Sequence, residues 1–170
     1  MNTSNSNRPL RMFQGDRGID NNFEPEELLY RRFCPHEILG DRLAPDSIKF
    51  PDWSVNREKY SEPHDVQFPS GSNQVYLCCG IAGFSVADIP CKVDTQGIFT
   101  FNIEHNPKFD NYAHSELITY KNGVSGKELK NFKVSNTIKK TFRQLLSDKS
   151  RIISEPSSTG NCINSKQIIN

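Results

Sequence analysis

The sequence lacks the features that mark membrane and disulfide-rich proteins. No stretch approaches the about 20 apolar residues of a membrane-spanning helix, and no apolar leader region begins the chain. Its five cysteines form no Cys-x-x-Cys pair and are irregularly spaced, at Cys34, Cys78, Cys79, Cys91 and Cys162. Buried free thiols are typical of a reducing compartment, so we expect a cytoplasmic protein with no membrane partner.

Motifs of several enzyme classes are also missing. The chain has no Gly-rich phosphate loop, no P-loop and no nucleophile elbow. His114-Ser115-Glu116 has the His-x-Glu spacing of a zinc deaminase, but that site needs a downstream Pro-Cys-x-x-Cys, and only Cys162 follows. His105 and His114 do not have the spacing of a helical zinc pair either. We therefore expect no metal site, and the sequence assigns no cofactor.

Length and composition suit one folded domain with two loosely held ends. A chain of 170 residues with 35% hydrophobic residues and a mean hydropathy of -0.64 supports one modest core. Residues 1–22 are rich in Asn, Ser, Arg and Gly, and we expect them to form a disordered arm. Residues 23–155 are expected to form a single domain, and the Ser- and Asn-rich residues 156–170 a flexible tail.

Strand patterns dominate the middle of the chain. Residues 97–103 alternate between apolar and polar positions, which is typical of a half-buried strand. An Asn-Pro step ends this strand, because proline supplies no ladder N–H and makes its predecessor extended. Residues 112–120 predict the next strand. If the two strands pair as a hairpin, His105 and His114 lie near its loop end.

The best helix pattern covers residues 135–146, where apolar residues recur at helical spacing and Ser135 can serve as N-cap. The sequence therefore predicts an α+β fold, a mainly antiparallel sheet with one docked C-terminal helix and irregular loops. Residues 121–170 hold ten of the 21 Lys and Arg but three of the 20 Asp and Glu, a charge of +7 in a chain of +1. Lys139, Lys140 and Arg143 can thus meet a nucleic acid, a nucleotide or an acidic protein partner, or the helix simply packs beside the acidic body.

Acid–base chemistry is predicted around the hairpin. His114 and Glu116 lie two positions apart in a strand, so their side chains share a face. Imidazole titrates near neutral pH, and a carboxylate can orient it. We predict His114 and His105 as base and acid, with Glu116 orienting His114. The alternative is that both histidines are structural and bond to backbone carbonyls.

Two adjacent arginines add a candidate anion clamp. In an extended segment Arg31 and Arg32 point to opposite faces, so one of them can turn inward. An inward arginine is costly unless it is paired, which makes it suited to binding an anion. Arg31 or Lys59 would then stabilise the phosphate charge of an RNA or nucleotide substrate. A surface pair at the end of an element is the alternative.

Three positions in chain order resemble the Arg–Ser–Glu pattern of ADP-ribosyltransferase-like proteins, which include small toxins that consume NAD. They are the Leu-Tyr-Arg-Arg segment at residues 29–32, Ser54 and Glu116. The resemblance implies that an arginine grips the dinucleotide phosphate and that the glutamate stabilises a ribosyl cation. Ser54, Lys59 and Arg32 are the candidate ligand-binding residues.

Residues 28–155 also resemble a group of small uncharacterised bacterial proteins. The resemblance depends on residues 29–32, on Ser54-Val55-Asn56 and on residues 111–114, of sequence Asn-Tyr-Ala-His. It implies a bacterial intracellular origin and one compact domain.

The functional expectation is a polar site of His, Glu and Arg that binds or acts on a nucleotide, NAD or a nucleic acid, as in a toxin-like transferase or a nuclease. The alternative is a non-catalytic binding or accessory subunit that uses its basic helix. The catalytic hypothesis requires Arg31, His114 and Glu116 to line one concavity.

Overall fold

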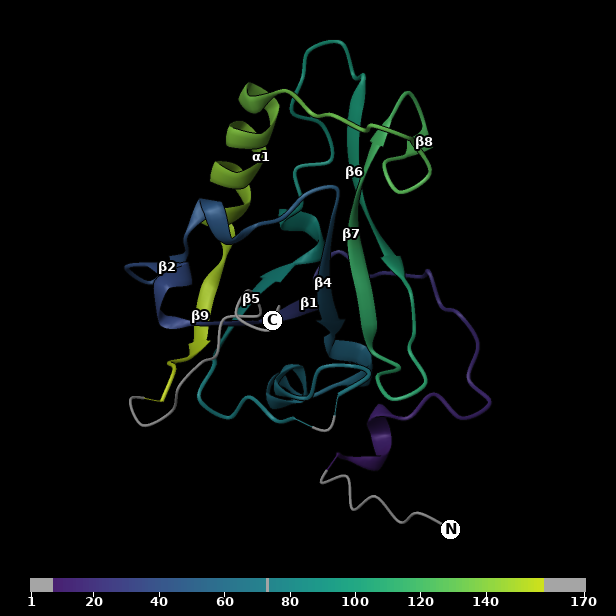
Figure 1. Ribbon diagram of the computed structural model, residues 1–170, viewed down its shortest axis with the longest axis vertical. Helices are drawn as coiled ribbons and strands as arrows, with labels where there is room; N and C mark the ends of the chain where they lie inside the picture. The colour runs from purple at the N-terminus through teal and green to yellow at the C-terminus, as the bar shows by residue number, and fades with distance from the viewer. Residues whose placement is uncertain (1–7, 73, 158–170) are drawn as a thin grey trace, which may run out of the picture.

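An antiparallel sheet organises the computed structural model, which describes residues 8–72 and 74–157 (Figure 1). Within these residues seven strands form one sheet, in the order β6-β7-β4-β1-β5-β9 with β8 beside β7, and β2 pairs with β3 separately. Every pairing is antiparallel. The strands are β1 (Leu28–Phe33), β2 (Ile38–Leu39), β3 (Arg42–Leu43), β4 (Asp52–Arg57), β5 (Gly80–Ser85), β6 (Phe99–His105), β7 (His114–Lys121), β8 (Val124–Ser125) and β9 (Arg151–Ser154).

One α-helix, α1 (Asn136–Lys149), lies among the described residues, near the C-terminal end. Short 3₁₀ helices join the strands: η1 (Leu10–Met12), η2 (Pro35–Glu37), η3 (Pro45–Ser47), η4 (Glu58–Tyr60), η5 (Pro63–Gln67) and η6 (Val86–Asp88). This arrangement confirms the predicted α+β class, a mainly antiparallel sheet with one C-terminal helix. No helix in the described ranges is long and apolar enough to cross a membrane.

The helix forms and docks for the reasons that its sequence indicates. The Ser135 hydroxyl caps it by accepting a hydrogen bond from the Ile138 N–H, at 3.3 Å. Phe142 and Leu146 are buried, and the Phe142 ring stacks on Phe101 of β6 with centroids 4.0 Å apart. Each such side chain contributes on the order of 1.5–3 kcal/mol, so packing on the sheet stabilises α1.

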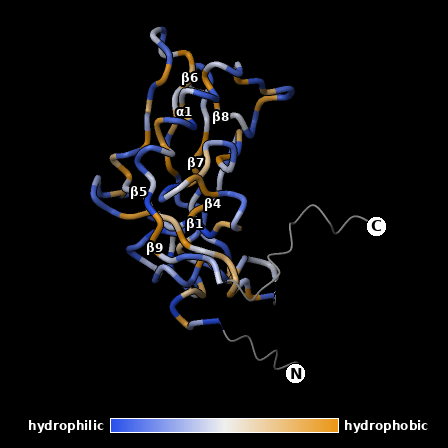
Figure 2. The backbone as a smooth tube through the Cα atoms, turned by 90° about the vertical axis from the view of Figure 1, so that its left-hand side faces the viewer, coloured by the Kyte–Doolittle hydropathy of each residue, from blue (hydrophilic) through white to orange (hydrophobic). Residues whose placement is uncertain are grey.

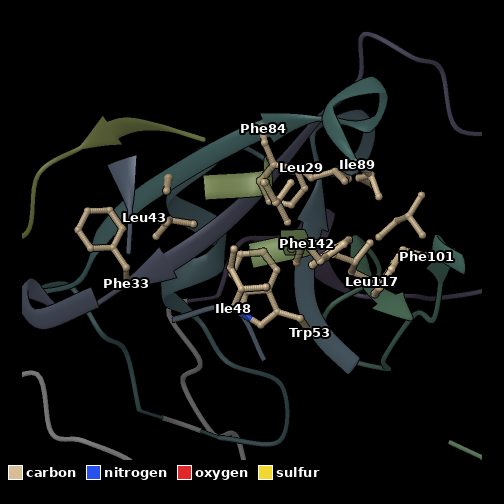
Figure 3. Packing of buried hydrophobic residues seen from close by; sticks show 14 of the residues in the cluster. Leu29, Phe33, Leu43, Ile48, Trp53, Phe84, Ile89, Phe101, Leu117 and Phe142 are labelled. Carbon is tan, nitrogen blue, oxygen red and sulfur yellow. The ribbon is translucent and has the colours of Figure 1, made fainter. Parts of the chain in front are cut away.

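The main core lies between α1 and one face of the sheet. Figure 3 shows Leu29, Trp53, Phe101, Leu117 and Phe142 gathered in one cluster, contributed by four strands and the helix. Apolar and polar residues alternate along much of the chain, as the orange and blue segments of Figure 2 show. Because strand side chains alternate between faces, the polar residues between these apolar ones point away from α1.

Register decides which polar residues meet on that second face. Ser54 of β4 lies opposite Glu116 of β7, and Asn56 lies opposite His114. Side chains that are directly opposite in neighbouring strands approach closely on the same face. The sheet therefore brings a row of polar groups together on the face that α1 does not cover.

The predicted hairpin is present. β6 pairs with β7 from Phe99 opposite Lys121 to His105 opposite Ser115. The Asn106 N–H donates to the His114 carbonyl at 3.1 Å, which closes the ladder at the loop end. Both histidines are thus near the loop, as expected.

The prediction of a disordered arm was wrong for the described part of that segment, residues 8–22. Met12 is fully buried, and its carbonyl accepts a hydrogen bond from the Tyr112 N–H at 2.6 Å. Few but well-placed anchors hold the segment, a pattern that its average composition does not reveal. Residues 1–7 and 158–170, and with them Cys162 and most of the predicted tail, lie outside the described residues.

A buried ion pair fastens the next part of the chain to the sheet. The Arg57 guanidinium of β4 is fully buried and donates to both oxygens of Glu27, at 2.8 Å each. It also donates to the carbonyl of Asn22 at 2.7 Å, and the Phe23 ring lies 3.8 Å from it. Arg57 therefore anchors residues 22–27 to β4.

Candidate functional site

A cavity of about 430 Å³ opens on the polar face of the sheet. It is lined by residues of β1, β4 and β7, by η5 with the loop that follows it, and by the loop between β6 and β7. The polar side chains in its wall belong to Tyr30, Arg31, Arg32, Ser54, Asn56, Ser70, Lys108, Asn111, His114 and Glu116.

The cavity lies where two central strands separate. β1 pairs with β5 along all six of its residues, but with β4 only through Leu29 opposite Arg57 and Tyr30 opposite Asn56. Beyond this point the Nη1 of Arg31 donates to the Ser54 carbonyl at 2.8 Å. A side chain thus takes the place of the strand-to-strand hydrogen bonds, and the gap gives the cavity access to Arg31.

Arg31 carries a charge that no carboxylate contacts directly among the described residues. Within the described residues it forms no ion pair, and its Nε and Nη2 make no hydrogen bond. Its guanidinium lies 5.4 Å from the Trp53 ring. Burial, and then the like charge of Arg32, lower the pKa of Arg31 to about 10. The charge of Glu37 opposes this lowering without forming an ion pair, and the guanidinium remains cationic at neutral pH.

Two further cations line the same cavity. Arg32 donates to the Val66 carbonyl at 3.1 Å and lies 4.9 Å from the Tyr76 ring. Neither Arg32 nor Lys108 has a carboxylate within ion-pair distance in the part of the chain that the structure describes. Arg32 and Lys108 therefore lie with one carboxylate, Glu116, in the cavity wall. By strand alternation Arg31 shares the face of Leu29 and Phe33, and it borders the cavity only through the gap between β1 and β4.

His114 is prepared to accept a proton. Its Nδ1 lies 2.7 Å from the Asn106 carbonyl, and because a carbonyl can only accept, Nδ1 must carry the hydrogen. Nε2 is then the acceptor, and it lies 3.9 Å from Oε1 of Glu116. Burial lowers the pKa of His114 below its usual value, against opposing contributions from Asn106 and Glu116. The imidazole is therefore neutral at neutral pH.

Glu116 remains ionised although it is buried. Burial alone would raise its pKa, but hydrogen bonds from Lys127 and Asn106 outweigh it and lower the pKa below its usual value. The Asn106 amide donates to Oε2 at 2.7 Å, and the Lys127 ammonium donates to the same oxygen. Oε1 is the carboxylate oxygen nearer to His114.

The cavity brings together most of the residues that the sequence indicates. Arg31, Arg32, Ser54, His114 and Glu116 all line it. They come from three adjacent strands, in the order β1, β4 and β7.

His105 and Lys59 do not line this cavity, so the structure does not bring them together with His114 and Arg31 there. His105 lies opposite Ser115, one position from Glu116, and its side chain therefore points to the other face of the sheet. Its Nε2 donates to the Tyr112 carbonyl at 2.6 Å, and its Nδ1 accepts from the Asp20 N–H at 2.9 Å. Lys59 pairs with Asp20 at 2.8 Å. His105 therefore fits the alternative of a structural histidine that bonds to backbone groups.

Sequence reasoning missed five polar residues of the cavity wall, Tyr30, Asn56, Ser70, Lys108 and Asn111. Asn56 follows Ser54 by two positions in β4, so the alternation of strand side chains could have found it. Lys108 and Asn111 are in the loop between the hairpin strands, where no periodicity applies. A bridge pairs these two residues across that loop.

The basic residues of α1 lie outside this cavity. The Arg143 Nε donates to the Ile48 carbonyl at 2.9 Å, and its Nη1 lies 3.4 Å from Asp46. This arginine therefore helps to dock the helix. Lys140 is exposed.

Comparison with known proteins adds no relative. Among residues 8–72 and 74–157 no group of three or more His, Cys, Asp or Glu side chains is placed to hold a metal ion. Searches of protein families, of curated proteins and of solved structures find no match to this chain.

Proposed function

We propose that the cavity binds a phosphate-bearing nucleotide, with NAD as the first candidate, and that His114 and Glu116 act on the bound ligand. The observation that supports this most is Arg31, a partly enclosed guanidinium with no carboxylate partner among the described residues. A phosphate would supply the missing anion, because the planar fork of arginine matches phosphate oxygens in a bidentate geometry.

Size and shape favour a small molecule over a polymer. A concave site of about 430 Å³ falls within the range of small-molecule and cofactor pockets. A nucleic acid would require a long basic surface, whereas the cationic groups here converge on one concavity. Arg31 and Arg32 would bind the phosphates, and Lys108 would approach them from the loop.

The remaining groups suit cleavage of the bond between nicotinamide and ribose. The carboxylate of Glu116, ionised at neutral pH, would stabilise positive charge that develops on the ribose as nicotinamide leaves. Neutral His114 would take the proton of the attacking water or hydroxyl through Nε2. The order Arg31, Ser54 and Glu116 on three adjacent strands agrees with the resemblance to ADP-ribosyltransferase-like proteins.

Calorimetric titration with NAD tests the binding part of this proposal. Arg31→Met removes the charge at similar length, and we expect it to weaken NAD affinity at least about tenfold. Arg42→Met is the matched control, because Arg42 forms a partly exposed ion pair with Asp148 and does not line the cavity. Equal affinities of wild type and Arg31→Met for NAD would refute the proposal.

Consumption of NAD tests the catalytic part. His114→Ala should abolish turnover while the far-ultraviolet circular dichroism spectrum stays unchanged. If a folded His114→Ala variant consumed NAD as fast as wild type, His114 would not be the base, and only the binding part of the proposal would remain.

The basic helix is the less favoured location for a function. Because Arg143 already bonds to Ile48 and approaches Asp46, Lys139 and Lys140 would have to provide most of the contact. The double change to glutamate should weaken RNA or DNA binding at low salt if the helix binds phosphates. If the double variant binds RNA or DNA as well as wild type does, the basic helix only packs against the rest of the domain.

A further inference from the structure

We infer that Asn56 and Asn111 together recognise a planar ligand edge that carries a hydrogen-bond acceptor beside an N–H donor. Such an edge occurs on a carboxamide, as in nicotinamide, and on a nucleobase. The inference rests on the proposed function and extends it, because it adds a subsite for an uncharged part of the nucleotide.

The two amides satisfy each other only in part. The Nδ2 of Asn111 donates to the Oδ1 of Asn56 at 2.8 Å. This leaves the Nδ2 of Asn56 and the Oδ1 of Asn111 without a hydrogen-bond partner, although the residues are only 3% and 4% exposed. Rotation of both amides by a half-turn leaves the same combination, a free donor on one residue and a free acceptor on the other.

Buried polar atoms without a partner are rare, and each one requires an explanation. The described residues contain four such side-chain atoms, and the other two belong to Ser47 and Trp53, which do not line the cavity. Both members of the asparagine pair are in the cavity wall. A ligand bound in the cavity would supply the missing partners.

The pair has the right chemistry for one kind of edge. Asn56 would donate to an acceptor on the ligand, and Asn111 would accept from an adjacent N–H. The diphosphate of a dinucleotide carries acceptors alone and would satisfy Asn56 but not Asn111. Asn56 lies opposite His114 in the sheet, so an edge bound here would hold the ligand beside the predicted base.

Asn56→Asp tests the inference, because it keeps an oxygen for the Asn111 N–H and replaces the free donor by an acceptor that carries a negative charge. Wild type and variant are titrated with NAD, with ADP-ribose, which lacks nicotinamide, and with inorganic pyrophosphate. Asn102→Asp, on an exposed position of β6, controls for the added negative charge. We expect Asn56→Asp to weaken NAD binding about tenfold more than it weakens pyrophosphate binding.

The ADP-ribose titration identifies the source of the edge. If Asn56→Asp weakens ADP-ribose binding as much as NAD binding, the recognised edge belongs to adenine. If it weakens ADP-ribose binding only as much as pyrophosphate binding, the edge belongs to the carboxamide. An equal loss for all three ligands would reduce the effect to charge and overturn the inference. If wild type binds none of the three ligands, the proposed function is overturned, and the inference with it.

Discussion

The Arg31 guanidinium donates a hydrogen bond of 2.8 Å to the Ser54 carbonyl at the point where β1 and β4 stop pairing. This contact lies at the gap between the two strands, and it places the charge of Arg31 beside that gap. The strands on either side remain paired to other strands, so the gap has a rigid frame. Rigid elements that hold a few polar groups in fixed positions are the usual basis of a specific site.

Substitution by methionine should destabilise the protein much less at Arg31 of β1 than at Arg57 of β4. Arg31→Met removes a charge that has no carboxylate partner, so the free energy of unfolding should change by no more than about 1 kcal/mol. Arg57→Met leaves Glu27 buried and unpaired, and should cost about 3–5 kcal/mol. Urea denaturation of both variants measures the difference. A large loss for Arg31→Met would mean that this arginine stabilises the fold rather than binds a ligand.

His114 should set the pH dependence of NAD turnover on the acidic side. Because its pKa is lowered below 6.5, His114 is neutral at pH 7 and becomes protonated only at a more acidic pH. The value of kcat/KM should therefore be flat near neutrality and fall as the pH drops through this lowered pKa. His114→Gln, whose amide can still donate to the Asn106 carbonyl, should lower the rate by about 10²–10⁴-fold and abolish that fall. An unchanged profile in this variant would exclude His114 as the base.

His105 should make the protein less stable at mildly acidic pH. Burial lowers its pKa, and its Nδ1 already accepts the Asp20 N–H, so the folded state binds a proton less readily than the unfolded state. The free energy of unfolding should be constant above 6.5 and decrease as the pH falls from there towards the lowered pKa. Urea midpoints at several pH values should show a smaller decrease for His105→Gln than for wild type. Substitution of His36 or His64, both exposed, is the control.

Arg8 should position two walls of the cavity. It is buried and donates to the carbonyls of Phe68, Pro69, Ser72 and Asp110, at 2.9–3.1 Å. Phe68 and Pro69 line the cavity, and residue 110 lies between Lys108 and Asn111, which also line it. Arg8→Met should therefore weaken nucleotide affinity and accelerate proteolysis near Gly71, without loss of the sheet. Arg42→Met again serves as the control. If nucleotide affinity and the rate of proteolysis are unchanged in Arg8→Met, the loops at residues 68–72 and 108–111 keep their conformation without Arg8.

Local patterns were sufficient for the β6–β7 hairpin, for the helix and for part of the site. Alternation identifies β6 and β7, helical spacing identifies α1, and each feature depends on residues within a few positions of one another. The shared face of His114 and Glu116 follows in the same way, from a spacing of two. These predictions hold because a strand or helix with one apolar side can bury that side in only one phase.

Contacts between distant segments could not be read from such patterns. Whether His105 joins His114 depends on the register of the hairpin, and a shift of one residue changes the face on which it lies. The disordered arm was a wrong prediction because the partners of Arg8 lie 60–102 residues away in the chain. The Asn56–Asn111 pair joins residues 55 positions apart. Periodicity describes the side of an element that is buried, and the packing of separate elements decides which polar groups meet there.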